Sequence, residues 1–211
     1  MEEESTLQIK LITLGESGVG KTNLLTRYFE GKFSLSTAPT IGVDFFSRRV
    51  RLAGEEGGIG EVAIWDTVGQ ERFRCLTKSL FQGTKGYFFV YDMSDKASFE
   101  AIEFWLKTVR QFSEGAEING ALVANKADLL SKIEVSSQKG REFAEKNLLQ
   151  FYEVSALENK ENCVDNMFEE VIEKAFAEHG AKVGLYIKPE PKATDYKKNP
   201  LTVEDGSKGC C

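Results

Sequence analysis

The chain has 211 residues, 28% of them charged, and a formal net charge of −6 at pH 7. This length suits one domain with an appendage, and a domain of that size buries enough surface to fold without disulfides. Because the chain is acidic and has no long block of lysine or arginine, we set aside general nucleic-acid binding. Its first residues are acidic where a secretory signal is basic, and no apolar run is as long as a membrane span, so we expect a protein kept on the cytosolic side.

The first strong pattern runs from Gly15 to Thr22, reads Gly-Glu-Ser-Gly-Val-Gly-Lys-Thr and fits G-x-x-x-x-G-K-[ST]. A β-branched run at 8–14 precedes it, and apolar residues at helical spacing follow at 23–29. This setting predicts a phosphate cradle, in which Lys21 reaches the β- and γ-phosphates of a nucleotide and Thr22 offers its hydroxyl to Mg²⁺. The predicted ligand-binding residues here are Ser17, Gly18, Val19, Gly20, Lys21, Thr22 and Asn23.

Residues 41–64 predict an antiparallel hairpin whose glycine-rich connection, 53–60, is longer than usual. Asp66 follows its second strand, where a carboxylate can hold Mg²⁺ through the water shell of the ion. Gly69 can bring its N–H to a γ-phosphate. Gln70 can orient a water for in-line attack, because an amide both donates and accepts. We therefore predict Gln70 as the catalytic residue.

Further buried strands are expected at 86–91, 120–124 and 149–154, with helices at 102–112 and 164–175. This alternation predicts a mostly parallel sheet covered on both faces, with the site at the carboxyl ends of its strands.

The segment Asn125-Lys126-Ala127-Asp128 follows one of these strands. A carboxylate there suits guanine, because it can accept both the N1–H and the 2-amino protons, a pair of donors that adenine lacks. Lys126 can lay its aliphatic stem along the ring. Phe33 can cover the base by stacking, although simple burial in the core is the alternative interpretation.

Together, Gly15 to Thr22, Thr40, Asp66 to Gln70, Asn125 to Asp128 and Ser155-Ala156 resemble the five nucleotide motifs of Ras-like small GTPases. Five further segments look like the Rab branch: Ile41-Gly42-Val43-Asp44-Phe45, Trp65-Asp66-Thr67, Glu71-Arg72-Phe73, Tyr91-Asp92 and Ser98-Phe99-Glu100. The resemblance implies an α/β Ras-like P-loop fold with a six-stranded, mostly parallel sheet, one antiparallel edge strand and helices on both faces. It divides the chain into an acidic extension (1–6), a GTPase domain (7–180) and a hypervariable tail (181–211), which we expect to be disordered from about residue 188.

The same resemblance assigns Thr40 to Mg²⁺ and to the γ-phosphate, within a first switch at 33–45 and ahead of a second at about 66–82. It adds Ser155, Ala156 and Leu157 to the base site, with Leu157 at a position where lysine is usual. The implied effector surface consists of Ile41, Gly42, Val43, Asp44, Phe45, Trp65 and Leu80. Leu80 stands where the family normally has an aromatic residue.

The last two residues, Cys210 and Cys211, resemble the double geranylgeranylation site of Rabs, and two lipid chains anchor a protein stably where one does not. The resemblance implies a monomer on the cytoplasmic face of an endomembrane that cycles with the cytosol. It implies an exchange factor, a GTPase-activating protein, effectors, a prenyltransferase and a GDP-dissociation inhibitor or escort protein as partners.

The expected function is a GTP-binding and GTP-hydrolysing switch in vesicle traffic, with a low intrinsic rate. Val68 replaces the usual alanine beside Gly69, and we hypothesise that it slows hydrolysis further. One alternative is a module that stays loaded with GTP and recruits effectors; Val68 favours it and Gln70 argues against it. Another is a P-loop phosphotransferase, which would need a lid and a second substrate site.

Overall fold

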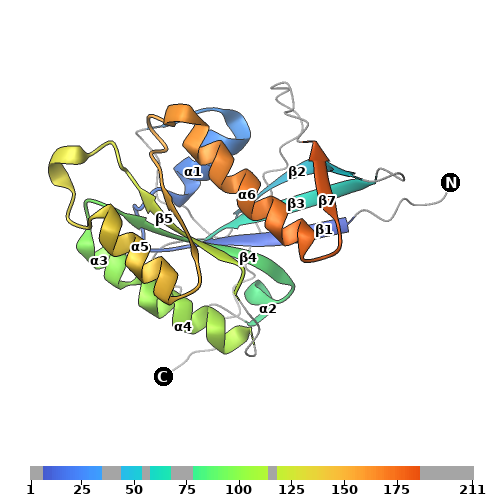
Figure 1. The fold of residues 1–211 in the computed structure, drawn as a ribbon, viewed down its shortest axis with the longest axis horizontal. Coiled ribbons are helices and arrows are strands. Elements are labelled where there is room, and N and C mark those ends of the chain that lie inside the picture. Colours follow the sequence, from blue (N-terminus) through green and yellow to red (C-terminus); the bar gives the residue numbers. More distant parts are fainter. Residues whose placement is uncertain (1–6, 35–43, 54–57, 68–77, 114–117, 186–211) are drawn as a thin grey trace, which may run out of the picture.

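The computed structural model describes residues 7–34, 44–53, 58–67, 78–113 and 118–185. Within them, seven strands form one sheet in the order β6-β5-β4-β1-β3-β2-β7 (Figure 1). The strands are β1 (Leu7–Leu14), β2 (Asp44–Ala53), β3 (Ile59–Asp66), β4 (Thr84–Asp92), β5 (Gly120–Asn125), β6 (Gln150–Glu153) and β7 (Lys182–Leu185). The α-helices are α1 (Lys21–Glu30), α2 (Lys78–Phe81), α3 (Lys96–Glu100), α4 (Ile102–Phe112), α5 (Ser137–Lys146) and α6 (Cys163–Ala177).

The sheet confirms the predicted α/β class and corrects the strand count. β1 pairs in parallel with β3 and β4, and β5 continues the parallel order to β6. β2 is antiparallel to both of its neighbours, β3 and β7. The described sheet therefore has seven strands where six were expected, and the antiparallel strand lies one position inside the edge.

The additional strand exists because the chain reverses after α6. Gly180 adopts a φ of 74°, and the N–H of Ala181 donates to Phe176 O at 3.1 Å. The chain then runs back along β2, where Val183 lies opposite Leu52. Ala181 and Val183 also pack against the core, so β7 covers part of the edge that β2 would otherwise expose.

Two apolar layers cover the sheet, one on each face. Helices α1 and α6 bury side chains such as Phe29 and Phe168 on one face, while α2, α3, α4 and α5 cover the other (Figure 1). β4 supplies both layers, with Phe88 in the first and Phe89 in the second. A strand buried on both faces reads as a continuous apolar run, as residues 86–91 do.

The register of the sheet brings the functional loops to one end. Thr13 of β1 lies opposite Asp66 of β3, and Asp92 of β4 lies opposite Asn125 of β5. The loops that follow these four strands therefore start side by side, at the carboxyl ends where α/β sheets bind ligands.

Candidate nucleotide-binding site

The loop between β1 and α1 follows a path that requires glycine. Gly15 has a φ of +144° and Gly20 a φ of +96°, a range that other residues rarely adopt. A Cβ on Gly15 would overlap Val90 O, and one on Gly20 would lie 2.5 Å from Asn125 Nδ2. The phosphate loop thus packs directly on β4 and on the Asn125 amide.

Lys21 lies inside this loop at the start of α1. Its side chain is buried, and Nζ donates to Gly15 O and Glu16 O, both at 2.8 Å. Burial lowers the pKa of Lys21 to about 8, although the charges of Asp66 and Glu16 act in the opposite direction. A buried ammonium surrounded by backbone dipoles at a helix N-terminus fits an anionic ligand.

Thr22 and Asp66 form a second polar pair beside the loop. Thr22 Oγ1 donates to Asp66 Oδ2 at 2.6 Å. The other carboxylate oxygen, Oδ1, is buried and accepts no hydrogen bond from the described residues. Burial raises the pKa of Asp66, while the Thr22 hydrogen bond and the Lys21 charge oppose the rise. These hard oxygens fit Mg²⁺, which is usually held by one or two protein groups together with phosphate oxygens.

Asn125 joins the phosphate loop to the loop that follows β6. Its Nδ2 donates to Val19 O at 2.8 Å, and its Oδ1 accepts from Ala156 N at 3.3 Å. The residue is only 1% exposed. Both ends of the amide thus bind protein backbone, which fixes the two loops relative to each other.

Asp128 and Ser155 meet, although they follow different strands. Ser155 Oγ donates to Asp128 Oδ1 at 2.5 Å and accepts from Glu158 N at 3.0 Å. The Ser155 hydroxyl therefore fixes the orientation of the Asp128 carboxylate, while its contact with a base stays a prediction.

Lys126 is held by a carboxylate that the sequence analysis did not include in the site. It adopts a φ of 63°, and its Nζ lies 2.6 Å from Asp92 Oδ2. Asp92 Oδ1 in turn accepts from the N–H of Ser94 at 2.8 Å and from its hydroxyl at 2.7 Å. The pairing fixes the Lys126 head group, while the contact of its stem with a base stays a prediction.

Phe33 is partly buried against the core layer of α1 and α6, in accord with the alternative interpretation. Its ring centroid lies 6.0 Å from the guanidinium carbon of Arg27. Stacking on a base stays a prediction. Asn23, at the start of α1, donates through Nδ2 to Ser34 O at 3.2 Å, next to Phe33 in the sequence.

Two more contacts were missed by sequence reasoning. Trp105 Nε1 of α4 donates to Glu16 Oε1 in the phosphate loop at 3.2 Å. Arg27 of α1 donates to the carbonyl oxygens of Ala156 and Leu157. Trp105 lies on an apolar helix face, a pattern that predicts burial in the core. Arg27 lies near a helix end, a pattern that predicts a solvent-exposed charge. Neither pattern therefore indicated a role in the site.

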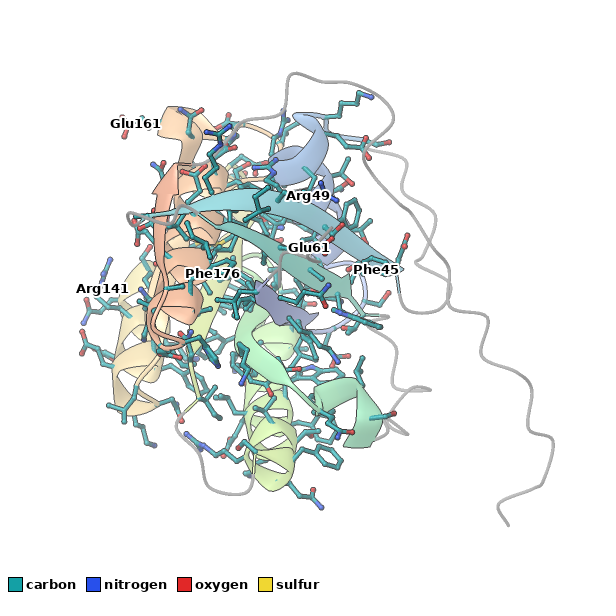
Figure 2. The ribbon with its side chains drawn as sticks, turned by 90° about the vertical axis from the view of Figure 1, so that its right-hand side faces the viewer. Phe45, Arg49, Glu61, Arg141, Glu161 and Phe176 are labelled. Atoms are coloured by element: carbon teal, nitrogen blue, oxygen red, sulfur yellow. The ribbon has the colours of Figure 1, made fainter. Side chains whose placement is uncertain are left out.

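The described part of the predicted effector surface forms one patch. Phe45 and Trp65 lie opposite each other on β2 and β3 with ring centroids 5.7 Å apart. Lys10 Nζ lies 4.7 Å from the Trp65 ring and donates to Leu80 O at 2.6 Å. Asp44, the first residue of β2, accepts from Phe45 N at 3.0 Å. Figure 2 shows Phe45 near one end of β2, with Arg49 and Glu61 farther along the paired strands.

Several predicted residues lie outside the described part of the chain: Thr40, Ile41, Gly42, Val43, Val68, Gly69, Gln70, Cys210 and Cys211. Among the helices that the structure does describe, none is long and apolar enough to cross a membrane.

Comparison with known proteins identifies the family. A family model described as the Ras family matches residues 10–177. Ras-related protein Rab-18 of Lymnaea stagnalis is 43% identical over 173 residues, which cover 82% of this chain and 83% of that protein. Ras-related protein RabC of Dictyostelium discoideum is 36% identical over 214 aligned positions, with 100% of both chains covered. Ras-related protein RIC2 of Oryza sativa subsp. japonica is 39% identical over 175 residues, or 83% of this chain and 78% of that protein. Because the family match spans every loop of the site described above, we conclude that the chain belongs to the Ras family and is a Rab-type small GTPase.

Proposed function

We propose that this chain is a GTP-driven switch in vesicle traffic, with a GTPase domain that extends past the expected end at residue 180 to include β7 (Lys182–Leu185), and an anchoring tail after it. The observation that carries the proposal is the Asn125 amide, which bonds the phosphate loop at Val19 and the base loop at Ala156. Phosphate recognition and base recognition therefore belong to one rigid unit. Such a unit suits a single nucleotide better than two separate substrates.

At the phosphate end of the site, different buried residues bind the phosphates and Mg²⁺. Lys21 binds the β- and γ-phosphates, because its ammonium is already desolvated and aimed into the loop. Thr22 Oγ1 and, through the water shell of the ion, the Asp66 carboxylate would hold Mg²⁺, with Thr40 completing the set. When bound, Mg²⁺ neutralises the charge that develops on the phosphate oxygens.

At the base end, Asp128 accepts the N1–H and 2-amino protons of guanine, and Ser155 keeps the carboxylate in place. Ala156 and Leu157 offer backbone N–H groups to the oxygen at C6. Phe33 and the Lys126 stem cover the two faces of the ring. The bound forms are GTP and GDP.

Hydrolysis depends on the two switches. Gln70 orients the attacking water, while the N–H groups of Thr40 and Gly69 bind the γ-phosphate and order both switches. Loss of that phosphate releases them. The arginine that stabilises the transition state comes from an activating protein. Without that protein, the intrinsic rate of hydrolysis is therefore low.

Val68 supports a second candidate, a module that keeps GTP and recruits effectors with negligible turnover. Its two additional methyl groups beside Gly69 restrict the approach of the second switch to the γ-phosphate. Single-turnover GTP hydrolysis separates the candidates when the wild type is compared with Val68→Ala and Gln70→Leu, each with and without a GTPase-activating domain.

A hydrolysing switch predicts measurable wild-type turnover that the activating domain accelerates and that Gln70→Leu reduces at least about 100-fold. The Val68 hypothesis predicts faster intrinsic turnover for Val68→Ala. Equal intrinsic rates for the wild type and Val68→Ala would reject that hypothesis. Wild-type turnover as low as that of Gln70→Leu, even with the activating domain, would support the second candidate.

Effectors bind the patch formed by Phe45, Trp65 and Leu80 together with Ile41, Gly42, Val43 and Asp44. This surface is ordered with GTP and loose with GDP. Lys10 supports the patch, because it contacts both the Trp65 ring and Leu80 O.

Prenylation of Cys210 and Cys211 attaches the monomer to the cytoplasmic face of an endomembrane. A prenyltransferase adds the lipids, an exchange factor loads GTP on the membrane, and a GDP-dissociation inhibitor or escort protein carries the GDP form through the cytosol. Imaging a tagged chain in its own cell beside a Cys210→Ser, Cys211→Ser form tests the anchor. The altered form is expected in the cytosol, and unchanged membrane targeting would contradict the lipid assignment.

A further inference from the structure

Arg27 contacts two loops that are far apart in the sequence. It lies in the last turn of α1, and all three of its guanidinium nitrogens donate to backbone carbonyls. Nε donates to Ala156 O at 2.9 Å and Nη2 to Leu157 O at 3.0 Å. Nη1 donates to Gly31 O at 3.0 Å.

These carbonyls belong to the two segments that flank the base site. Ala156 and Leu157 follow Ser155, whose hydroxyl orients Asp128. Gly31 ends α1 and leads to Phe33, whose ring lies 6.0 Å from the Arg27 guanidinium carbon, at the outer limit of a cation–π contact. One side chain therefore fixes the distance between the two segments.

Of the two residues, Leu157 is the less restrained by other contacts. Ala156 is buried in the core and its N–H donates to Asn125 Oδ1, whereas Leu157 is 45% exposed, so packing does not hold it. The planar guanidinium, in contrast, binds two successive carbonyls with a preformed fork and so determines how the peptide planes are oriented. Because the carbonyl of one residue and the N–H of the next lie in the same peptide plane, binding Ala156 O orients the Leu157 N–H, and binding Leu157 O orients the Glu158 N–H, which donates to Ser155 Oγ.

We propose that Arg27 is a positioning residue for guanine recognition, which holds the backbone N–H of Leu157 toward the oxygen at C6 of the base. This inference rests on the proposed function, that the site binds guanine nucleotides. Through this backbone contact, Arg27 favours the binding of purines that carry a C6 oxygen, although its side chain does not touch the base.

The test compares how fast the intact protein releases two fluorescently labelled nucleotides. One is GDP, and the other is the diphosphate of 2-aminopurine riboside, which keeps the 2-amino group but lacks both the C6 oxygen and the N1–H, so its release is compared only between variants. Arg27→Gln is expected to release GDP about 30-fold faster than the wild type, because the Leu157 N–H loses its alignment. Release of the analogue is expected to change less than about threefold, since it has no C6 oxygen to accept from that N–H. Arg27→Lys, which offers one donor centre in place of a fork, is expected to fall between the wild type and Arg27→Gln.

Arg48→Gln is the matched control. Arg48 also donates to a backbone carbonyl, Tyr28 O at 2.9 Å, and its guanidinium carbon lies 4.3 Å from the Tyr28 ring centroid, but it contacts neither base segment. Its replacement is expected to lower the urea midpoint and to leave the ratio of the two release rates unchanged. Thermal unfolding of all variants shows whether each one folds.

Two outcomes would overturn the inference: a release ratio that Arg27→Gln leaves unchanged, whether or not both nucleotides leave faster, or the same change of ratio in Arg48→Gln. Failure of the proposed function gives a different result. In that case the wild type itself would hold GDP no more tightly than ADP.

Discussion

Replacing Gly20 with alanine tests whether Asn125 couples the phosphate loop to the base loop. The new Cβ would lie 2.5 Å from Asn125 Nδ2, so the amide must move away from Val19 O and Ala156 N. The positive φ costs about 1 kcal/mol, and each buried partner left without its hydrogen bond costs about 1 to 3 kcal/mol. We expect Gly20→Ala to lower the free energy of unfolding by about 3 to 7 kcal/mol and to accelerate GDP release at least about 100-fold.

Gly180→Ala provides the control for this experiment. Gly180 has a φ of +74°, no atom of the described residues would lie within 4 Å of an added Cβ, and the residue follows α6, away from the site. The substitution is expected to cost about 1 kcal/mol and to leave GDP release within about twofold of the wild type. Urea denaturation at one fixed GDP concentration and the release of labelled GDP measure both effects. If Gly20→Ala costs no more than Gly180→Ala, Asn125 does not couple the loops.

Three further predictions concern other parts of the molecule. The pKa of Lys21 in the free protein is about 8, against 10.5 ordinarily, so nucleotide binding above pH 8 requires uptake of a proton. GDP affinity should therefore fall about tenfold from pH 7 to pH 9. A GDP affinity that does not change over this range would contradict the prediction. Trp105→Phe removes the donor to Glu16 Oε1 while it keeps an aromatic ring. It should accelerate GDP release about threefold to tenfold. An unchanged release rate would mean that α4 does not support the phosphate loop. Gly184→Val places side-chain atoms against the Ala53 backbone, where a Cβ would lie 3.1 Å from Ala53 Cα. It should remove the hydrogen-exchange protection of β7 without altering GDP release, and retained protection would contradict the pairing.

Much of the site was predictable because its groups follow strands in a parallel sheet. Lys21, Thr22 and Asp66 lie in the sequence at positions that a β–loop–α unit and a neighbouring strand end must bring together. Asp128 and Ser155 follow β5 and β6, which pair in parallel, so their meeting also follows from the alternation of strands and helices.

The contacts that hold the site together were not predictable from local patterns. Arg27 lies 129 residues from Ala156 in sequence, and its spacing on α1 is that of an ordinary polar helix position. Asn125 was expected only as part of the base-recognition segment 125–128, yet its amide binds two backbone groups that only the folded chain brings within reach.

Two elements of the fold carry weak signals for physical reasons. α5 buries only Gly140 and Ala144 within its bounds, too few apolar side chains for a clear helical stripe. β7 is four residues long and contains Gly184, and it depends on pairing with β2. Its sequence alone, Lys-Val-Gly-Leu, gives little preference for a strand.

Guanine recognition by Asp128 is tested most directly by exchanging its carboxylate for an amide. Asp128→Asn keeps the size of the side chain but places a donor where the 2-amino group of guanine also donates. The variant should release GDP at least about 100-fold faster than the wild type and should bind xanthosine diphosphate, whose C2 carbonyl accepts from the new amide. An Asp128→Asn protein that releases GDP at the wild-type rate, and still prefers it to xanthosine diphosphate, would contradict the assignment of this site to guanine nucleotides.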